Sequence, residues 1–185
     1  MLASEKRYEE FAYVLDFLPG GKSAVIKGRE GPIVQGIGEE RLTLLELLAV
    51  ENQDFELGER LRIGREGRDK IVSVLGKLTY EDLTSESKTQ LPGVCEAIVK
   101  ANEARYVAYF NELQPLTPRL HGLELIPGIG KTFMKTIVSE REKRPFTSFD
   151  DIQNRVGLRD PARLVAKRIV EEISGDSRIN IFIKK

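Results

Sequence analysis

The chain is best understood from the seven-residue stretch LIPGIGK at positions 125–131. Two glycines flank one isoleucine there, so the backbone can turn with a positive φ and leave its N–H groups uncovered. After the turn, the apolar residues between positions 133 and 138 repeat at the three-and-four spacing of an amphipathic helix. The first N–H groups of such a helix have no partners and its dipole is positive at that end. We therefore expect the turn to bind an anion, and phosphate is the expected one.

This stretch resembles the helix-hairpin-helix motif, whose core is hydrophobic, Pro, Gly, hydrophobic, Gly and then a basic helix. The likeness extends over residues 123–141. In that family, the hairpin amides bind the sugar-phosphate backbone of DNA or RNA without reading bases. The resemblance implies contacts through Gly128, Ile129 and Gly130, with positive charge from Lys131 and Lys135. The alternative is a turn between two packed helices that binds no ligand.

The distribution of charge favours a polyanionic partner for the last third of the chain. The formal net charge of the 185 residues is zero. Residues 1–80 carry 12 basic and 14 acidic side chains, residues 81–118 carry 3 and 6, and residues 119–185 carry 14 and 9. The positive third contains the glycine turn, which supports a nucleic-acid partner there.

The composition predicts neither a metal site nor a disulfide. The single cysteine, Cys95, and the single histidine, His121, cannot supply an internal disulfide or the usual zinc ligands. No apolar run approaches the roughly 18 residues of a membrane span, and the N-terminus leads into charged residues. We expect a cytoplasmic protein with no cofactor, no metal and no membrane partner.

The first 80 residues predict a small β-barrel. Between residues 11 and 17 the apolar residues alternate, which predicts a half-buried strand with Phe11, Tyr13 and Phe17 on one side. Turn residues at 19–22 and an extended pattern at 24–27 predict a hairpin. Further strands are expected at 33–37, 42–50, 60–63 and 71–78, with a turn at 36–38, and the 42–50 run could equally be a helix.

A five-stranded barrel of this kind is similar to the OB or S1 class, which often binds single-stranded nucleic acid with aromatic and basic side chains. The three aromatic residues of the first strand could be such platforms. We favour the alternative that they fill the core, because bulky aromatic side chains in a small barrel are mostly buried. The basic residues beside them are Lys22, Lys27, Arg62, Arg65 and Arg68.

Residues 81–118 predict a helical connector with capping residues at 84–87, and residues 119–175 predict a pair of helix-hairpin-helix units. Ser148 is expected to cap a short connecting helix. A shift of 32 residues aligns the second unit, but Gly128 then falls on Asp160 and Ile129 falls on Pro161. Asp-Pro is a common helix start, so we expect this unit to pack rather than to expose amides. Its basic residues, which could still touch a backbone, are Arg163, Lys167 and Arg168.

The C-terminal residues 176–185 alternate enough to predict a strand, and a lone strand needs a partner. An edge of the N-terminal barrel is the expected partner. The predicted fold is therefore α+β, with a small OB-like barrel, a helix-hairpin-helix domain and a C-terminal strand.

The whole order of elements resembles an archaeal family of uncharacterised proteins regarded as nucleic-acid binders. This resemblance implies no known reaction. From the helix-hairpin-helix motif we expect a protein that binds the backbone of RNA or DNA without sequence specificity, and without a catalytic constellation we expect no enzyme. The alternatives are a nucleic-acid-processing enzyme and a protein–protein interaction module using the second unit. No catalytic residues are predicted, because Asp150 and Asp151 are explained by helix capping and His121 has no catalytic partners.

Overall fold

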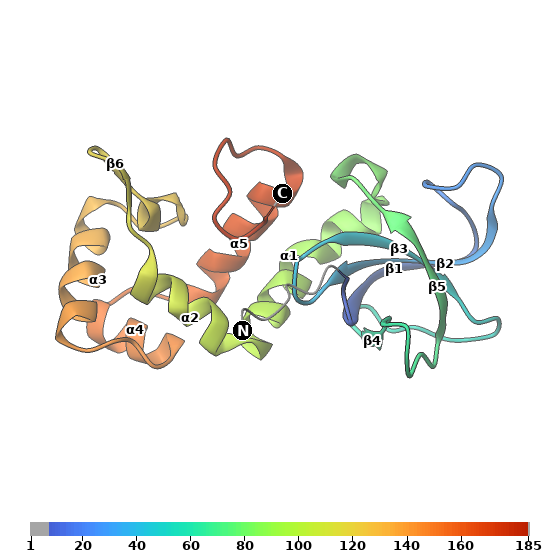
Figure 1. Ribbon diagram of the computed structural model, residues 1–185, viewed down its shortest axis with the longest axis horizontal. Helices are drawn as coiled ribbons and strands as arrows, with labels where there is room; N and C mark the ends of the chain where they lie inside the picture. The colour runs from blue at the N-terminus through green and yellow to red at the C-terminus, as the bar shows by residue number, and fades with distance from the viewer. Residues whose placement is uncertain (1–7, 185) are drawn as a thin grey trace, which may run out of the picture. The chain divides into compact units, whose positions relative to one another are not determined.

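The computed structural model describes residues 8–184, which form two compact units (Figure 1). The first unit comprises residues 8–94 with 183 and 184, and the second comprises residues 95–182. The strands are β1 (Phe11–Lys22), β2 (Glu30–Gly38), β3 (Leu44–Ala49), β4 (Arg60–Arg62), β5 (Ile71–Lys77), β6 (Pro115–Thr117) and β7 (Leu120–His121). The α-helices are α1 (Ser85–Ala101), α2 (Glu103–Glu112), α3 (Lys131–Lys143), α4 (Phe149–Val156) and α5 (Pro161–Ser174), and the 3-10 helices are η1 (Tyr80–Asp82) and η2 (Gly122–Leu125). The predicted α+β class is confirmed.

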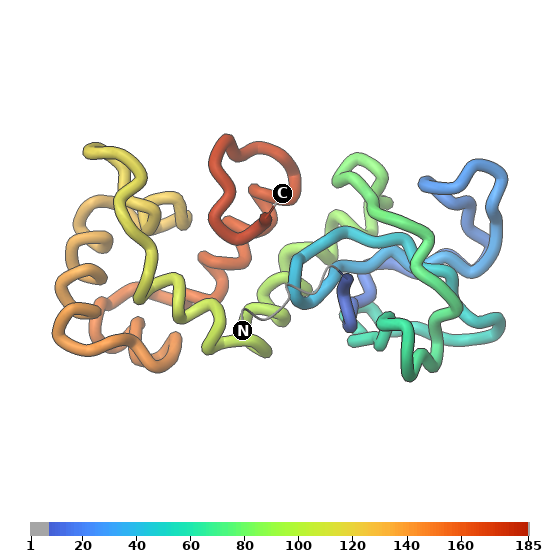
Figure 2. The backbone as a smooth tube through the Cα atoms, in the orientation of Figure 1, coloured from blue at the N-terminus to red at the C-terminus, as the bar shows by residue number. Residues whose placement is uncertain are grey.

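The first unit is a curled antiparallel half-barrel with the strand order β4-β1-β2-β3-β5 (Figure 2). Strand β1 bends because its register with β2 shifts between Val14 and Asp16 and again between Leu18 and Gly21. Strands β4 and β5 are the two ends of this order. The half-barrel therefore has two free edges, which are joined in sequence by residues 63–70.

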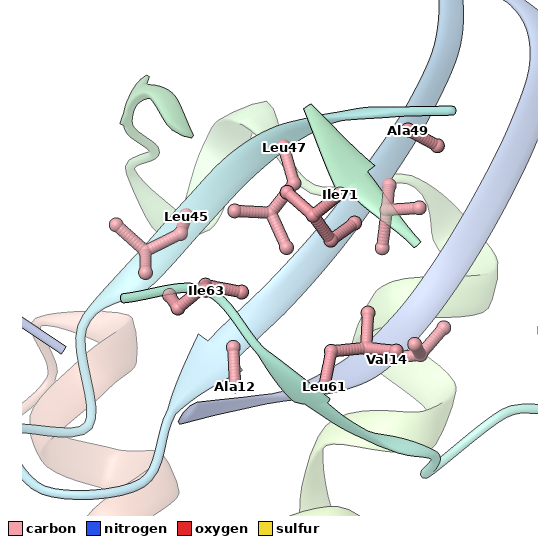
Figure 3. Close-up of a cluster of buried hydrophobic side chains, with 9 residues drawn as sticks. Ala12, Val14, Leu45, Leu47, Ala49, Leu61, Ile63 and Ile71 are labelled. Carbon is pink, nitrogen blue, oxygen red and sulfur yellow. The ribbon is translucent and has the colours of Figure 1, made fainter. Parts of the chain in front are cut away.

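The concave side of the half-barrel holds the hydrophobic core of this unit (Figure 3). Strand β1 contributes Ala12 and Val14 to this cluster, and after the bulge Phe17 packs against it with Phe55. The prediction that Phe11, Tyr13 and Phe17 lie on one side of β1 is therefore only partly right. Tyr13 is buried outside this cluster, whereas Phe11 is half-buried beneath the guanidinium of Arg60, 3.5 Å from its ring centroid.

The predicted hairpin at residues 19–27 is wrong. Residues 19–22 continue β1, and residues 23–29 form the connection to β2. The cause is a contact distant in sequence, since the Glu46 carboxylate accepts hydrogen bonds from the Ser23 hydroxyl and, at 2.7 Å, from the Ala24 N–H. The expected turn at 36–38 likewise lies within β2. The ambiguous run at 42–50 contains strand β3 and no helix.

The start of α1 is fixed to the sheet by polar contacts. The buried Gln35 side chain accepts hydrogen bonds from the Thr84 N–H (3.0 Å) and the Ser87 hydroxyl (2.7 Å). Thr84 also caps the helix, because its hydroxyl accepts from the Ser87 N–H at 3.0 Å. The predicted cap at residues 84–87 is confirmed.

The second unit packs its helices around buried apolar side chains that include Phe110, Leu123 and Ile152. The Arg155 guanidinium closes the C-terminal end of α3 by donating hydrogen bonds to the carbonyls of Glu140 (2.6 Å) and Arg144 (2.8 Å). A cation at the C-terminal end of a helix also complements the helix dipole. This contact holds α4 against α3.

The predicted C-terminal strand is wrong for residues 176–184, which contain no strand. The segment is held by α5 instead of by a sheet edge. The Glu172 carboxylate accepts hydrogen bonds from the N–H groups of Ile181 (3.0 Å) and Phe182 (2.9 Å), and Arg168 donates to the carbonyl of Ile179. Because these side chains satisfy the backbone, the segment has no need of a strand partner.

Candidate functional site

The glycine turn, defined as residues 128–130, joins η2 to α3. Gly128 has a φ of +87°, a conformation that favours glycine, and a Cβ at this position would lie 3.3 Å from Leu164 Cδ1. Gly130 has a φ of −93° and a ψ of −168°, which any residue can adopt, and a Cβ there would meet no atom within 4 Å. The two glycines thus have different roles: the first allows the turn and the second leaves open space.

The amides of the glycine turn are only partly available. The Ile129 N–H donates to the Ile126 carbonyl at 3.1 Å, and the Ile129 side chain is buried. Within residues 8–184, the N–H groups of Gly128 and Gly130 have no hydrogen-bond partner. Gly130 is the N-cap of α3 and offers no side-chain cap, and the first turn of α3 contains no acid. The N-terminus of α3 is therefore uncapped and has no carboxylate in its first turn.

Lys131 is already engaged by its own chain. Its ammonium lies 3.0 Å from Glu124 Oε2 and also donates to the carbonyl of Arg119. The pKa of Glu124 is lowered, first by the hydrogen bond from the His121 N–H and then by Lys131. A phosphate at Lys131 would have to compete with this carboxylate. Sequence reasoning missed the pair because seven residues and a turn separate its members.

His121 is a structural residue at the start of η2. Its Nδ1 accepts a hydrogen bond from the Leu123 N–H at 3.1 Å, while the Glu124 carboxylate accepts from the His121 N–H at 2.7 Å. The side chain is buried, and burial lowers the pKa of its imidazole, with Arg141 and Lys131 adding to the effect. The neutral ring therefore fixes the short helix that leads into the glycine turn.

Three of the predicted cationic residues are exposed and form no ion pair in the described part of the chain. Lys135 on α3 and Arg163 and Lys167 on α5 are exposed, and their side chains have no ion pair among the described residues. Arg163 is adjacent to Leu164, the residue that packs against Gly128. Arg168 differs from the other three: it is buried and lies 3.0 Å from Glu172 Oε2, so it is not available to a ligand.

A second turn, residues 157–160, precedes α5 and has a similar backbone. Gly157 has a φ of +80° and is followed by the buried Leu158, just as Gly128 is followed by a buried isoleucine. The predicted shift of 32 residues is wrong for this turn: α3 starts at Lys131 and α5 at Pro161, and the left-handed glycines are Gly128 and Gly157. The two offsets differ because one more residue separates Gly157 from its helix. The apolar-Gly-apolar pattern at 156–158 was the available signal.

Among residues 8–184 no group of three or more His, Cys, Asp or Glu side chains could hold a metal ion. Cys95 is buried, and burial raises the pKa of its thiol to about 12. No described helix is both long enough and apolar enough to cross a membrane.

A curled antiparallel half-barrel linked to an α-helical unit with an uncapped helix N-terminus defines an α+β protein of two units. The family described as "Protein of unknown function (DUF655)" matches residues 8–184, and the chain belongs to this family. It is similar to the uncharacterized protein MJ0038 of Methanocaldococcus jannaschii, with 43% identity over 178 residues, 96% of this chain and 80% of that protein.

The fold is also similar to the crystal structure of Af1531 from Archaeoglobus fulgidus, which is titled a DUF655 protein. The TM-score is 0.84 at 41% identity, and the match covers 95% of this chain and 100% of that one. The predicted resemblance to an uncharacterised archaeal family is thereby confirmed.

Proposed function

We propose that this protein binds RNA or DNA through the sugar-phosphate backbone, without sequence specificity, and that residues 119–175 act as a pair of helix-hairpin-helix units. The N-terminus of α3 is the contact point. Gly128 and Gly130 supply free N–H groups, and the exposed Lys135 supplies charge one helical turn further along. Such contacts position a nucleic acid without reading its sequence.

The observation that carries this proposal is the open N-terminus of α3. A side-chain cap can satisfy one of the first N–H groups of a helix, as in α4, where the Ser148 hydroxyl accepts from the Asp151 N–H at 2.9 Å. Helices α2 and α5 make no such side-chain hydrogen bond, but their N-cap residues are Asn102 and Asp160, which carry polar side chains. In α3 the N-cap is a glycine, and the space beside it is empty. A phosphate oxygen fits such a position because the N–H groups and the helix dipole both favour an anion.

The two units contribute differently to this proposal. The second turn exposes Asp160 at its helix start, so repulsion disfavours a phosphate there, but Arg163 and Lys167 on α5 can approach a backbone held at the first turn. The OB-like identity of the half-barrel belongs to the same proposal. The support for this identity is that the half-barrel has five strands and is partly open, as an OB fold is. All of its neighbouring strands pair antiparallel, including β3 with β5.

Gly130→Val tests the glycine turn with little risk to the fold. The observed φ and ψ suit a valine and its Cβ would meet no atom within 4 Å, yet its branched side chain occupies the space that a phosphate needs. We expect a loss of affinity of about 1–3 kcal/mol for a labelled duplex and a labelled single strand, the scale of a few charge-assisted hydrogen bonds. Fluorescence anisotropy measures the affinity, and circular dichroism checks the helices.

Gly20→Val is the matched control. Gly20 also has no atom within 4 Å of its Cβ position and no positive φ, and it lies in the first unit. Gly36 is unsuitable, because a Cβ there would lie 3.0 Å from the Tyr13 carbonyl oxygen. A folded Gly130 variant that binds both nucleic acids as tightly as the Gly20 variant would rule out the glycine turn as the contact point.

A further inference from the structure

The first unit contains a cavity of about 720 Å³ that the proposed interface does not use. Its walls are the segment before β1, the start of β3, strand β5 and residues 62–68, which follow the free edge of β4. Five cationic side chains line it: Arg41, Arg62, Arg65, Arg68 and Lys77. The cavity is therefore strongly basic on its walls although the whole chain has no net charge.

These five cations are not neutralised by ion pairs in the part of the chain that the structure describes. Within residues 8–184 none of them forms an ion pair, whereas Arg60 lies 2.7 Å from Glu39 and Lys70 lies 2.8 Å from Glu59 on the same unit. Unpaired cations gathered around one cavity raise its electrostatic potential, and low-dielectric walls concentrate that potential. The cavity thus attracts an anionic ligand.

One of these side chains is held in place before any ligand binds. Arg68 donates through Nε to the carbonyls of Ile63 and Gly64, each at 3.0 Å, and through Nη1 to the Val72 carbonyl at 2.9 Å. Its Nη2 has no hydrogen-bond partner in the described part of the chain. A fixed guanidinium with a free edge binds an anion at a lower entropic cost than a mobile one.

The acids of the cavity do not cancel this charge. Glu9 is buried and its carboxylate accepts the N–H groups of Glu40 (2.9 Å) and Arg41 (2.7 Å), and burial raises its pKa. The other two acids in the lining are Glu10 and Glu66. The lining therefore contains five cations and three acids, so its net charge is positive. The carboxylate of Glu9 is also already hydrogen-bonded to backbone amides.

The cavity also offers apolar surface. Its lining includes Leu45 and Ile63, which belong to the hydrophobic core (Figure 3), and the ring of Tyr8, which is 73% exposed. The Arg65 guanidinium lies 6.0 Å from the centroid of that ring. An anion with an attached planar or apolar group fits this combination, and the volume is within the usual range for small-ligand sites, about 300–1,000 Å³.

We propose that this cavity is a nucleotide site, in which the arginines hold a phosphate and the apolar surface with Tyr8 receives the sugar and base. The inference rests on the proposed nucleic-acid binding for its choice of ligand. It adds a second contact point on the first unit. The nucleotide can be free or part of a single strand, since both present the same phosphate, sugar and base.

The test compares two double variants of the full chain. Arg65→Gln with Lys77→Gln removes two cations from the cavity without touching the hydrogen bonds of Arg68. Lys27→Gln with Arg29→Gln removes two exposed cations of the same unit that lie outside the cavity and have no ion pair. Each double variant is also combined with Gly130→Val. This combination distinguishes an error in the proposed role of the glycine turn from an error in the proposed role of the cavity.

The probes are adenosine 5′-monophosphate, ribose 5-phosphate, inorganic phosphate and a six-nucleotide oligouridylate, each titrated by calorimetry at several salt concentrations. We expect the cavity variant to bind the monophosphate or the oligonucleotide about tenfold more weakly, with a salt slope for the oligonucleotide lower by about two. We expect the control pair to change affinity less than about twofold, and Gly130→Val to leave cavity binding intact. Tighter binding of the oligonucleotide than of the monophosphate would assign the site to a strand, and the reverse to a free nucleotide.

Three results would overturn the proposal. The first is that neither the monophosphate nor the oligonucleotide binds the Gly130→Val protein. The second is that the cavity pair and the control pair weaken binding equally, which would show general charge attraction. The third is that a polyglutamate peptide binds the cavity more tightly than either nucleotide probe, which would indicate an acidic protein partner.

Discussion

The turns that precede α3 and α5 both begin with a left-handed glycine but differ in their N-cap residues and in their surroundings. Each has a glycine with a φ near +80° followed by a buried aliphatic residue. Neither N-cap residue makes a side-chain cap hydrogen bond, but the first turn ends at Gly130, which has no side chain, and opens a helix whose buried residue is Ile137. The second ends at Asp160 and Pro161 and opens a helix whose buried residues extend from Pro161 to Glu172.

This difference shows that a left-handed glycine alone does not decide how exposed the following helix is. A left-handed glycine precedes a largely exposed helix at the first turn and a largely buried helix at the second. What separates the two is the N-cap residue and the burial of the helix that follows. Our proposal therefore places the ligand at the first turn and gives the second a packing role, and three changes test that division.

The largest effect is expected from Glu172→Ala, because α5 is held by buried charge. The variant removes the partner of Arg168 and the acceptor of two backbone N–H groups. Breaking a buried pair in this way costs about 3–5 kcal/mol of unfolding free energy. Urea unfolding followed by circular dichroism measures it.

Glu171→Ala is the control for that change. Glu171 lies 3.5 Å from Arg168 Nη1, but its side chain is 47% exposed, so the expected cost is below about 1 kcal/mol. Similar losses in the two variants would mean that α5 is not anchored through its buried face, and the contrast between the helices would fail.

The second effect concerns the approach to the first turn and depends on pH. Burial lowers the pKa of His121 below its usual value of 6.5, so the unfolded chain takes up the proton first. The stabilisation is complete above pH 6.5 and is lost as pH falls through the folded pKa, at up to about 1.4 kcal/mol per pH unit. Protonation of Nδ1 would also break its hydrogen bond from Leu123.

Because His121 is the only histidine, one NMR resonance reports its titration directly. We expect a midpoint below 6.5 in the folded protein and a smaller loss of stability in His121→Gln as pH falls below 6.5. A midpoint at or above the ordinary value would show that η2 does not depend on a neutral ring.

The smallest effect is expected when the first turn is given the character of the second. Gly130→Asp places a capping carboxylate at a φ and ψ that suit an N-cap, so stability should rise by a few tenths to about 1 kcal/mol. Nucleic-acid affinity should fall, about tenfold, because the carboxylate occupies the anion position. Melting temperature and anisotropy report the two quantities.

Asp160→Asn is the matched change at the other turn. It removes an exposed charge at a left-handed position that asparagine tolerates, and it should leave affinity within about twofold of the wild type. The proposed roles would be wrong if Gly130→Asp did not weaken nucleic-acid binding. They would be reversed if Asp160→Asn increased the affinity by a larger factor than Gly130→Asp decreased it.

The sequence by itself determined the local features of the helical unit. The start of α3 after Gly130, the Ser148 cap of α4 and the start of α5 at Pro161 all lie where the sequence predicted them. Caps and left-handed glycines depend on a few adjacent residues, so they can be deduced from sequence alone. The α+β class and three of the strands, at 33–37, 60–63 and 71–78, followed from the sequence pattern in the same way, whereas the pattern at 42–50 left strand and helix open.

Tertiary structure alone decided the features that depend on distant residues. The bulge in β1 selected which residues face the core, Glu46 held residues 23–26 in a loop, and Glu172 held the C-terminal segment that alternation suggested was a strand. It also paired Lys131 with Glu124 and, as far as residues 8–184 show, left the cations of the half-barrel cavity without ion pairs. A carboxylate binds whichever donors the fold brings within about 3 Å, and sequence order does not specify which donors those are.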